Sequence, residues 1–226
     1  MPAILALDTS TQACSCALSI NGRISESFEI IPRQHANQIL PMISQLMEAH
    51  SLSFGELDAI AYGQGPGSFT GLRIAAGVTQ GIAMAASIPV VPVSSLASIA
   101  RQVRPGMQTA LVFSTLDARI DEVYWGLYRV DSSGVELLGS EGLCKPENLP
   151  NTLSGNPGSI IGVGSGMEFM QRMPDIYSEL ISDSQVDLFP RAATIVELAE
   201  NYLQKGVSQA PEDVNPVYLR DKVTHS

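Results

Sequence analysis

One short segment near the N-terminus constrains the fold more than any other part of the sequence. Residues 3–8 read AILALD, an unbroken apolar run that ends in an aspartate. Such a run is typical of a strand that is buried on both faces, which requires layers of structure on both sides of its sheet. The chain has 226 residues, enough for one large core or two smaller ones. The segment therefore predicts an α/β fold.

The segments downstream of this strand alternate between strand and helix patterns. The pair Asn21-Gly22 indicates a hairpin turn between two segments with strand periodicity. Two segments with apolar residues at helical spacing follow, and each precedes a further short strand. The predicted order is β-β-β-α-β-α-β, at residues 3–8, 14–20, 23–30, 33–50, 58–62, 68–86 and 89–93.

The second half of the sequence repeats this organisation. Residues 109–119 predict a strand that carries Asp117 near its end, and residues 159–166 predict a strand that runs into glycines. Helices are expected after Pro146, near residues 167–173 and near residues 194–204. We therefore predict a duplicated unit, with domains at 1–104 and 105–226 and with the last helix and tail able to pack back on the first domain. Two such lobes would form a cleft lined by both strand-end aspartates and both glycine-rich loops.

The charge balance limits the partners that the chain can bind directly. Its 23 acidic and 13 basic residues give a formal net charge of −10. Proteins bind nucleic acids largely by neutralising phosphates with basic residues, and this chain has few of them. We therefore expect that any binding of RNA is provided by another subunit. No apolar run approaches the ~20 residues that span a bilayer, and the N-terminal residues lack the basic segment of a signal peptide. We expect no membrane association.

The cysteines indicate free thiols rather than a disulfide framework. Three are present, and in residues 14–20 Cys14, Cys16, Leu18 and Ile20 alternate with serine or alanine. This spacing places both thiols on the apolar face of one strand, where cysteine behaves as a small hydrophobe. We therefore expect a reducing, cytoplasmic environment.

Residues 61–83 read AYGQGPGSFTGLRIAAGVTQGIA and place a glycine-rich loop between a predicted strand and a predicted helix. No lysine stands where a P-loop requires one, and Ser68 occupies the position of the third glycine in the dinucleotide-binding fingerprint. Two interpretations remain. Either the glycines form only a tight turn, or the helix N-terminus, capped by Ser68 or Thr70, receives an anion.

The helix that follows this loop has small residues along one face. Gly77, Gly81 and Ala85 lie about one turn apart, so another backbone can approach that face closely. The face packs either against the protein's own sheet or against a partner, and the sequence does not decide between the two.

Few residues are candidates for catalysis or metal binding. His35, His50 and His225 are far apart in the sequence, and we expect them at the surface rather than in a metal site. Asp8 and Asp117 end equivalent strands, and such carboxylates can bind magnesium or orient a nucleophile. Asp8 precedes a Thr-Ser-Thr segment and can instead hydrogen-bond its own turn.

Several motifs together resemble the bacterial TsaB (YeaZ) family. They are ILALDTSTQACSCAL, PRQHANQILPMI, AYGQGPGSFTGLRIAAGVTQGIA, LDARIDEVYW and PVYLR, and they extend from residue 3 to residue 220. The resemblance implies the α/β fold of actin, sugar kinases and heat-shock ATPases (ASKHA, ribonuclease H-like), with two duplicated βββαβα lobes. It also implies a role in forming N6-threonylcarbamoyladenosine (t6A) at position 37 of tRNAs that read ANN codons.

The resemblance further implies a subunit without catalytic activity of its own. Proteins of this family are paralogues of the transferase TsaD, which they bind, and the ATPase TsaE joins the same complex. We expect a homodimer when the chain is alone, and contact with tRNA only through the complex. TsaD-type proteins carry two metal-binding histidines four residues apart, and Ser95 and Ile99 stand at the matching positions here. Neither can replace imidazole, so we expect no metal and no cofactor on the isolated chain.

An alternative keeps the fold and changes the function. It is an ATP-dependent small-molecule kinase that uses Asp8 or Asp117 with magnesium. The segment after Asp8 lacks the glycine that lets phosphate approach the first hairpin in such kinases. ATP turnover by the isolated chain would distinguish this alternative from the scaffold.

Two sets of residues are predicted to contact other molecules. The partner or dimer interface is expected on the two N-terminal helices, at Ile39, Ile43, Leu46, Ile74, Gly77, Val78, Gly81 and Ala85. ATP or ADP is expected only at a junction with TsaD, where Arg73, Asp117 and Arg119 are nearest to the glycine-rich loop and the second strand end. Arg119 can equally be a structural arginine that pairs with Asp117, Asp121 or Glu122.

Overall fold

The computed structural model describes residues 2–104, 108–153 and 159–220, which group into two compact units. The first unit comprises Met1–Ser98 and Pro190–Val217, and the second comprises Ile99–Phe189 and Tyr218–Ser226. The predicted domains, 1–104 and 105–226, differ from this grouping at the boundary, which falls after Ser98. Residues 190–217, which include the last helix for which the prediction allowed packing on the first domain, are grouped with the first unit.

The first unit is built around a mixed sheet of five strands in the order β3-β2-β1-β4-β5. The strands β1, β2 and β3 form an antiparallel meander, and β4 and β5 run parallel to β1. At the β2–β3 turn, Asn21 and Gly22 have positive φ angles of 51° and 78°, as a two-residue hairpin turn favours. The strand bounds are Ile4–Asp8, Ala13–Ile20, Arg23–Ile30, Ala59–Gly65 and Val90–Ser94.

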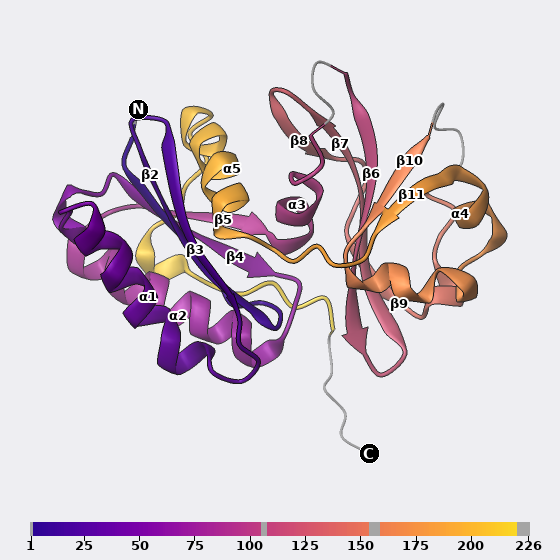
Figure 1. Ribbon diagram of the computed structural model, residues 1–226, viewed down its shortest axis with the longest axis horizontal. Helices are drawn as coiled ribbons and strands as arrows, with labels where there is room; N and C mark the ends of the chain where they lie inside the picture. Colours follow the sequence, from indigo (N-terminus) through magenta and orange to yellow (C-terminus); the bar gives the residue numbers. More distant parts are fainter. Residues whose placement is uncertain (1, 105–107, 154–158, 221–226) are drawn as a thin grey trace. The chain divides into compact units, whose positions relative to one another are not determined.

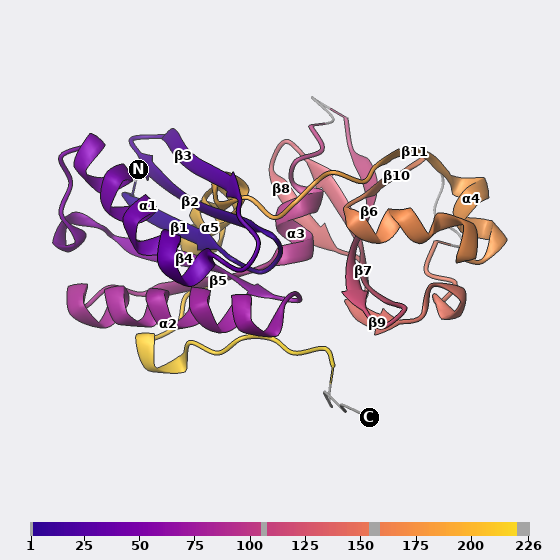
Figure 2. The same ribbon diagram turned by 60° about the horizontal axis from the view of Figure 1, so that its bottom comes forward.

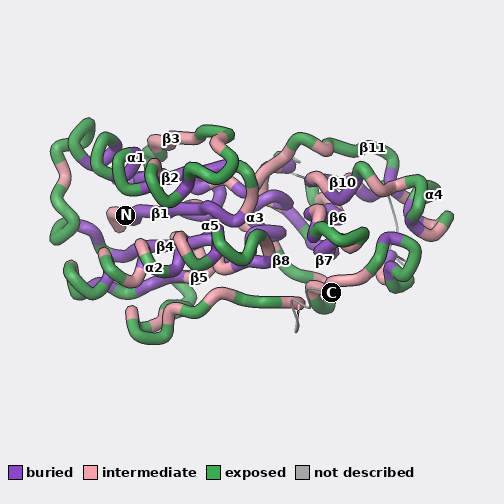
Figure 3. The backbone as a smooth tube through the Cα atoms, turned by 90° about the horizontal axis from the view of Figure 1, so that it is seen from below, coloured by how far each residue is buried: buried purple, intermediate pink, exposed green. Residues whose placement is uncertain are grey.

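Helices cover both faces of this sheet. The helices α1 (His35–Ala49) and α2 (Phe69–Ala86) lie on one face, and α5 (Ala192–Gln204) lies on the other (Figure 1). Every residue of β1 is therefore buried, as its apolar sequence predicts (Figure 3). The short helices η1 (Phe54–Glu56) and α3 (Ser95–Ala100) complete this part of the chain.

The segment after α5 returns along α2 (Figure 2). Gln209 exchanges two backbone hydrogen bonds with Val90, at 2.8 and 3.0 Å, and so covers the outer edge of β5. The short helix η4 (Pro211–Asp213) lies against α2, and the Val217 amide donates to the carbonyl of Gln64 at 2.8 Å. These contacts and the buried apolar face of α5 explain why the C-terminal segment belongs with the first unit.

The second unit repeats the strand order of the first. Its sheet has the order β11-β10-β6-β7-β8, with β9 paired to β7. The strands β6, β7 and β8 form an antiparallel meander, β10 runs parallel to β6, and β11 runs parallel to β10. The predicted duplication is therefore present in the topology. The bounds are Ala110–Arg119, Glu122–Asp131, Gly134–Leu137, Gly142–Cys144, Ile160–Val163 and Ile181–Gln185.

The sequence-based prediction was less accurate in the second unit. The helix expected after Pro146 is the single-turn 3-10 helix η2 (Pro146–Asn148), and the stretch near 167–173 is the 3-10 helix η3 (Ser165–Arg172). The helix α4 (Asp175–Leu180) and the strand β11 were not predicted. Only the first residue of β11 is buried, so its sequence carries no apolar alternation. No helix in the described ranges is long and apolar enough to cross a membrane.

Candidate functional site

The glycine-rich segment that runs from the end of β4 into α2 packs directly on the end of β1 and on the turn that follows it. A Cβ atom on Gly63 would lie 1.8 Å from Oδ2 of Asp8, and one on Gly71 would lie 1.9 Å from the carbonyl oxygen of Thr9. These distances are shorter than real Cβ atoms show, so a side chain at either position would force the neighbouring atoms to shift. The Thr9 hydroxyl also donates to the Gly71 carbonyl at 2.6 Å. The structure supports the turn interpretation of this loop, because the protein's own atoms fill the space beside the glycines.

The first turn of α2 is also held by a hydrogen bond to the turn that follows β1. Ser68 is the N-cap, and its hydroxyl accepts a long 3.4 Å hydrogen bond from the Gly71 amide. The Ser68 amide donates to the carbonyl of Ser10 at 2.7 Å. One turn further, the guanidinium of Arg73 lies 3.3 Å from the ring centroid of Phe69, an exposed cation–π contact. The role predicted for Arg73 in nucleotide binding stays a prediction.

Asp8 is a buried carboxylate with one satisfied and one unsatisfied oxygen. Its Oδ1 accepts hydrogen bonds from the amide and the hydroxyl of Ser10, at 2.9 and 2.8 Å. Its Oδ2 is buried and has no hydrogen-bond partner among the described residues. Burial raises the pKa of the Asp8 carboxyl to about 6, and the hydrogen bonds from Ser10 oppose that rise. The kinase alternative needs a carboxylate that magnesium can reach, and Asp8 is 1% exposed.

Asp117 lies near the end of β6, which occupies in the second sheet the place that β1 has in the first. Its carboxylate accepts hydrogen bonds from the amide of Arg119 at 2.8 Å and from the Arg119 guanidinium at 3.1 Å. The Asp117 amide donates to the hydroxyl of Ser165 at 3.1 Å. Arg119 thus forms one of the structural pairs that the sequence left open, while its side chain stays 82% exposed. Nucleotide contacts of Asp117 and Arg119 stay predictions.

The glycines that follow β10 repeat the packing seen in the first unit. A Cβ atom on Gly164, whose φ is +89°, would lie 2.1 Å from the carbonyl oxygen of Thr115 in β6. One on Gly166 would lie 2.7 Å from the Cβ of Thr115. In each unit, therefore, glycines at or after the strand that runs parallel to the central strand pack closely on the C-terminal half of that central strand or on the turn after it.

The small-residue face of α2 is open to solvent. Gly77 and Gly81 are exposed, and a Cβ atom on either would meet nothing within 4 Å. Ala85 continues this exposed face by one further turn. Ile74 and Val78 are half-buried and pack against the core of the first unit. Of the two interpretations of the flat face, packing on the protein's own sheet does not hold for Gly77 and Gly81.

The predicted interface residues of α1 are placed differently. Ile39 and Ile43 are fully buried and Leu46 is 9% exposed, and all three belong to the core of the first unit. The expectation that this stripe faces a partner is therefore wrong for the described chain, because the stripe is the face that covers the sheet. The exposed large apolar side chain on α1 is instead Leu40, at 50% exposure.

The histidines do not form a metal site in the described part of the chain. His35 is buried, and its Nε2 lies 3.2 Å from the carbonyl oxygen of Ala13, so the expected surface position is wrong for this residue. His50 is exposed, and His225 lies outside the described residues. No group of three or more histidine, cysteine or acidic side chains that could hold a metal occurs among the described residues. Cys14 and Cys16 are buried free thiols, as their spacing predicts.

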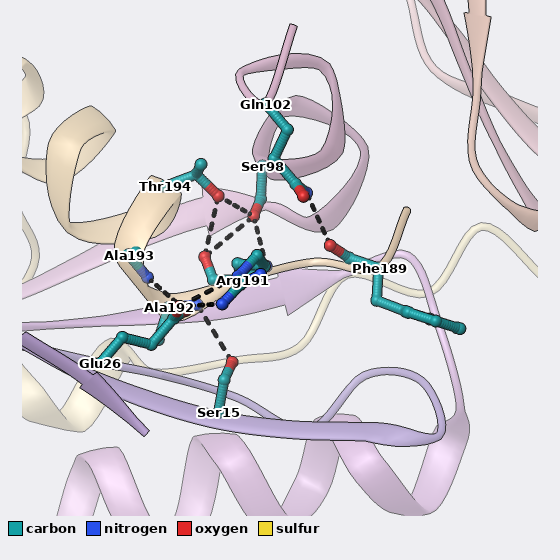
Figure 4. Close-up of polar contacts among 9 residues, drawn as sticks. All are labelled: Ser15, Glu26, Ser98, Gln102, Phe189, Arg191, Ala192, Ala193 and Thr194. Carbon is teal, nitrogen blue, oxygen red and sulfur yellow. Dashed lines mark hydrogen bonds and ion pairs between the residues drawn. The ribbon is translucent and has the colours of Figure 1, made fainter. Parts of the chain in front are cut away.

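The N-terminus of α5 is fixed by side chains from distant parts of the first unit, an arrangement that the sequence did not reveal (Figure 4). The Glu26 carboxylate of β3 accepts from the Ala193 amide at 3.0 Å and from Nε of Arg191 at 2.9 Å. The hydroxyl of Ser15 accepts from the Ala192 amide at 3.0 Å. The partners are about 165 or more residues apart in sequence, so only the folded chain brings them together.

Comparison with known proteins agrees with this architecture. The model of the TsaD family, described as tRNA N6-adenosine threonylcarbamoyltransferase, matches residues 28–226. Two proteins named tRNA threonylcarbamoyladenosine biosynthesis protein TsaB are similar over nearly their whole length. The Escherichia coli (strain K12) protein is 37% identical over 97% of this chain and 95% of its own, and the Haemophilus influenzae protein is 37% identical over 98% and 94%.

A solved structure is also similar to this chain over nearly its whole length. YeaZ from Pseudomonas aeruginosa is 39% identical, covers 97% of this chain and 100% of its own, and superposes with a TM-score of 0.90. The duplicated α/β units are thus those of the TsaD-type, ASKHA-like fold, and the predicted fold class is confirmed. Within that class, the chain belongs to the TsaB (YeaZ) family.

Proposed function

We propose that this chain is a non-catalytic scaffold subunit required for t6A formation at position 37 of tRNAs that read ANN codons. It acts in the cytoplasm by binding TsaD, and TsaE joins through the complex. The observation that carries this proposal is the nearly full-length similarity to proteins named for threonylcarbamoyladenosine biosynthesis.

The described residues support a role as scaffold rather than enzyme. Both glycine-rich segments pack closely on the protein's own central strands, and the Asp8 carboxylate is closed to solvent. Ser95 and Ile99, which replace the metal-binding histidines of TsaD-type proteins, are fully buried. The net charge of −10 is unfavourable for direct tRNA binding, so tRNA is reached through the complex.

The surface proposed for TsaD is the exposed face of α2. Gly77, Gly81 and Ala85 let a partner helix approach closely, and Leu40 of α1 adds exposed apolar area on a second helix. Paralogous chains present similar faces, so the same surface serves for self-association when TsaD is absent. ATP or ADP binds only at the junction with TsaD, where Arg73, Asp117 and Arg119 are the proposed contacts.

A reconstituted reaction tests the function. TsaD and TsaE from the same source are incubated with tRNA and the threonylcarbamoyl-adenylate donor, with and without this chain, and t6A is measured by nucleoside mass spectrometry. We expect t6A only when this chain and TsaD are both present. Modification by this chain alone, or a yield from TsaD and TsaE that is unchanged without it, would contradict the proposal.

The variant Gly81→Arg tests the surface. The arginine side chain enters open space in the free chain, so folding should be unchanged. At a helix–helix interface it must bury an unpaired cation, which costs several kcal/mol (about 3–5) and abolishes measurable TsaD binding. Gln204→Arg, on an exposed position of α5, is the matched control and should bind normally. If both variants bind TsaD alike in calorimetry, the α2 face is not the interface.

A further inference from the structure

The segment that follows α5 lies along the surface of the first unit and is poorly packed (Figure 2). Among residues 206–217, all of which the structure describes, none is buried, and Val214 is half-buried where it packs against the core. A cavity of about 520 Å³ is lined by residues 208–212 and by Met84 and Ser87 at the end of α2. A segment with few buried apolar contacts opens at a lower free energy than the core beneath it.

Side chains of the first unit hold the middle of this segment by hydrogen bonds. The side-chain amide of Gln80 donates to the Pro211 carbonyl at 3.0 Å, and the hydroxyl of Tyr62 donates to the Asn215 carbonyl at 3.1 Å. Residues 206–217 therefore form a strap that is fastened by polar contacts rather than by packing.

The end of the strap lies on the glycine-rich segment that leads into α2. The Val217 amide donates to the Gln64 carbonyl at 2.8 Å. A Cβ atom on Gly65, whose φ is +117°, would lie 2.7 Å from the Val217 carbonyl oxygen. Glycine at this position thus lets the two backbones approach one another closely.

The chain enters the second unit directly after this contact. The first unit includes Val217, and the second resumes at Tyr218. The guanidinium of Arg220 donates to the Ala118 carbonyl at 3.1 Å and pairs with the Glu122 carboxylate at 2.5 Å, both in the β6–β7 hairpin. The Arg220 side chain is 19% exposed, so solvent and salt weaken this pair less than a fully exposed one.

The short distance along the chain links these two contacts. Three extended residues span at most about 10 Å, so Val217 cannot move far while Arg220 stays on the hairpin. A Val217 amide that leaves the Gln64 carbonyl therefore remains close to it, at a high effective concentration, and rebinds. Release of Arg220 removes this restraint.

We propose that the strap opens separately from the core of the first unit, and that the contact of Arg220 with the β6–β7 hairpin keeps the end of the strap closed. Opening uncovers the Tyr62 hydroxyl and the Gln64 carbonyl, next to the segment that leads into α2. The strap is thus a two-state element through which the hairpin of the second unit influences this part of the first unit.

Hydrogen exchange of individual amides in the purified full chain tests the proposal. In the wild type, the amides of Gln209 and Val217 should exchange about tenfold or more faster than those of β1. In Arg220→Ala, exchange at Val217 should rise by about a further tenfold, as loss of a hydrogen bond from a charged group predicts, while β1 is unchanged. Arg172→Ala is the matched control, because Arg172 pairs with Asp121 in the same hairpin but lies outside the strap. It should leave exchange at Val217 unchanged.

Each alternative outcome overturns a part of the proposal. Equal exchange at Val217 in the wild type and in Arg220→Ala would refute the link to the hairpin. If β1 amides exchange as fast as Val217, the strap does not open separately. The same increase in Arg172→Ala would show that general loosening of the hairpin, and not Arg220, controls the strap. Should Arg220→Ala fail to fold, Glu122→Gln weakens the same ion pair and should speed exchange at Val217 by about threefold.

Discussion

The buried Asp8 carboxylate makes the stability of the first unit depend on pH in a direction opposite to that of most aspartates. Its ordinary pKa is 3.8, and burial raises it to about 6 in the folded chain. The folded state therefore binds the proton more tightly than the unfolded state between these two values. By linkage, stability is highest below the lower value and falls as the pH rises towards the higher one.

The magnitude follows from the same two values. A rise from 3.8 to about 6 corresponds to about 3 kcal/mol, because each pKa unit is about 1.4 kcal/mol. Asp8→Asn keeps the shape of the side chain, leaves an oxygen to accept from Ser10, and does not titrate. We expect the variant to be more stable than the wild type at pH 8, by up to about 3 kcal/mol, and to lose this advantage near pH 4.

Urea unfolding at a series of pH values measures this difference directly. Far-UV circular dichroism follows both units, whereas the fluorescence of Trp125, the single tryptophan, reports the second unit, so a separate transition of the first unit can be recognised. Asp117→Asn is the control, since that substitution weakens contacts with Arg119 and should lower stability. The reasoning would be refuted if the free energies of unfolding of the wild type and Asp8→Asn differed by the same amount from pH 4 to pH 8. It would also be refuted if the variant gained stability over the wild type at pH 4 rather than at pH 8.

Two further predictions concern packing and capping. Gly63→Ala places a methyl group 1.8 Å from an oxygen of Asp8 and should lower the stability by about 1–3 kcal/mol. Gly77→Ala adds a methyl group in open space on an exposed helix face and should raise the stability by up to about 1 kcal/mol. Melting temperatures that shift in the same direction would contradict this pair. Glu26→Gln weakens the hydrogen bond to the Ala193 amide at the start of α5 and the contact with Arg191, and should lower the stability by about 1 kcal/mol. Glu29→Gln, at an exposed position of the same strand, should leave the stability unchanged. Equal effects of the two glutamine variants on thermal unfolding would show that the cap is not stabilising.

The first unit was predictable from sequence because its local signals agree with its tertiary environment. The apolar run at residues 3–8 and the Asn21-Gly22 turn each have one favourable structural interpretation, and the structure has it. The side of α1 that is buried was not predictable in the same way. An apolar stripe such as Ile39 and Ile43 suits a core and an interface equally, and only the position of the sheet decides between them.

The network at the start of α5 illustrates a different limit. Glu26 lies in a strand whose pattern suggests an ordinary solvent-facing carboxylate, and Arg191 precedes a helix that the sequence placed in the second half. Their contact depends on residues 190–217 joining the first unit. A long-range polar contact of this kind leaves no periodicity in either segment, so reasoning from local patterns cannot find it.

The glycine loops show why a motif of this composition cannot be assigned from residues alone. Glycine is required wherever a backbone must be approached closely, whether by a phosphate or by the protein itself. Here the closest atoms are oxygens: Oδ2 of Asp8 at Gly63, the Thr9 carbonyl at Gly71 and the Thr115 carbonyl at Gly164. A phosphate at these places would have to displace those atoms and would meet a negatively polarised surface. The loop backbones are therefore poor candidates for holding a nucleotide, and the contacts proposed for Arg73 and Arg119 stay predictions.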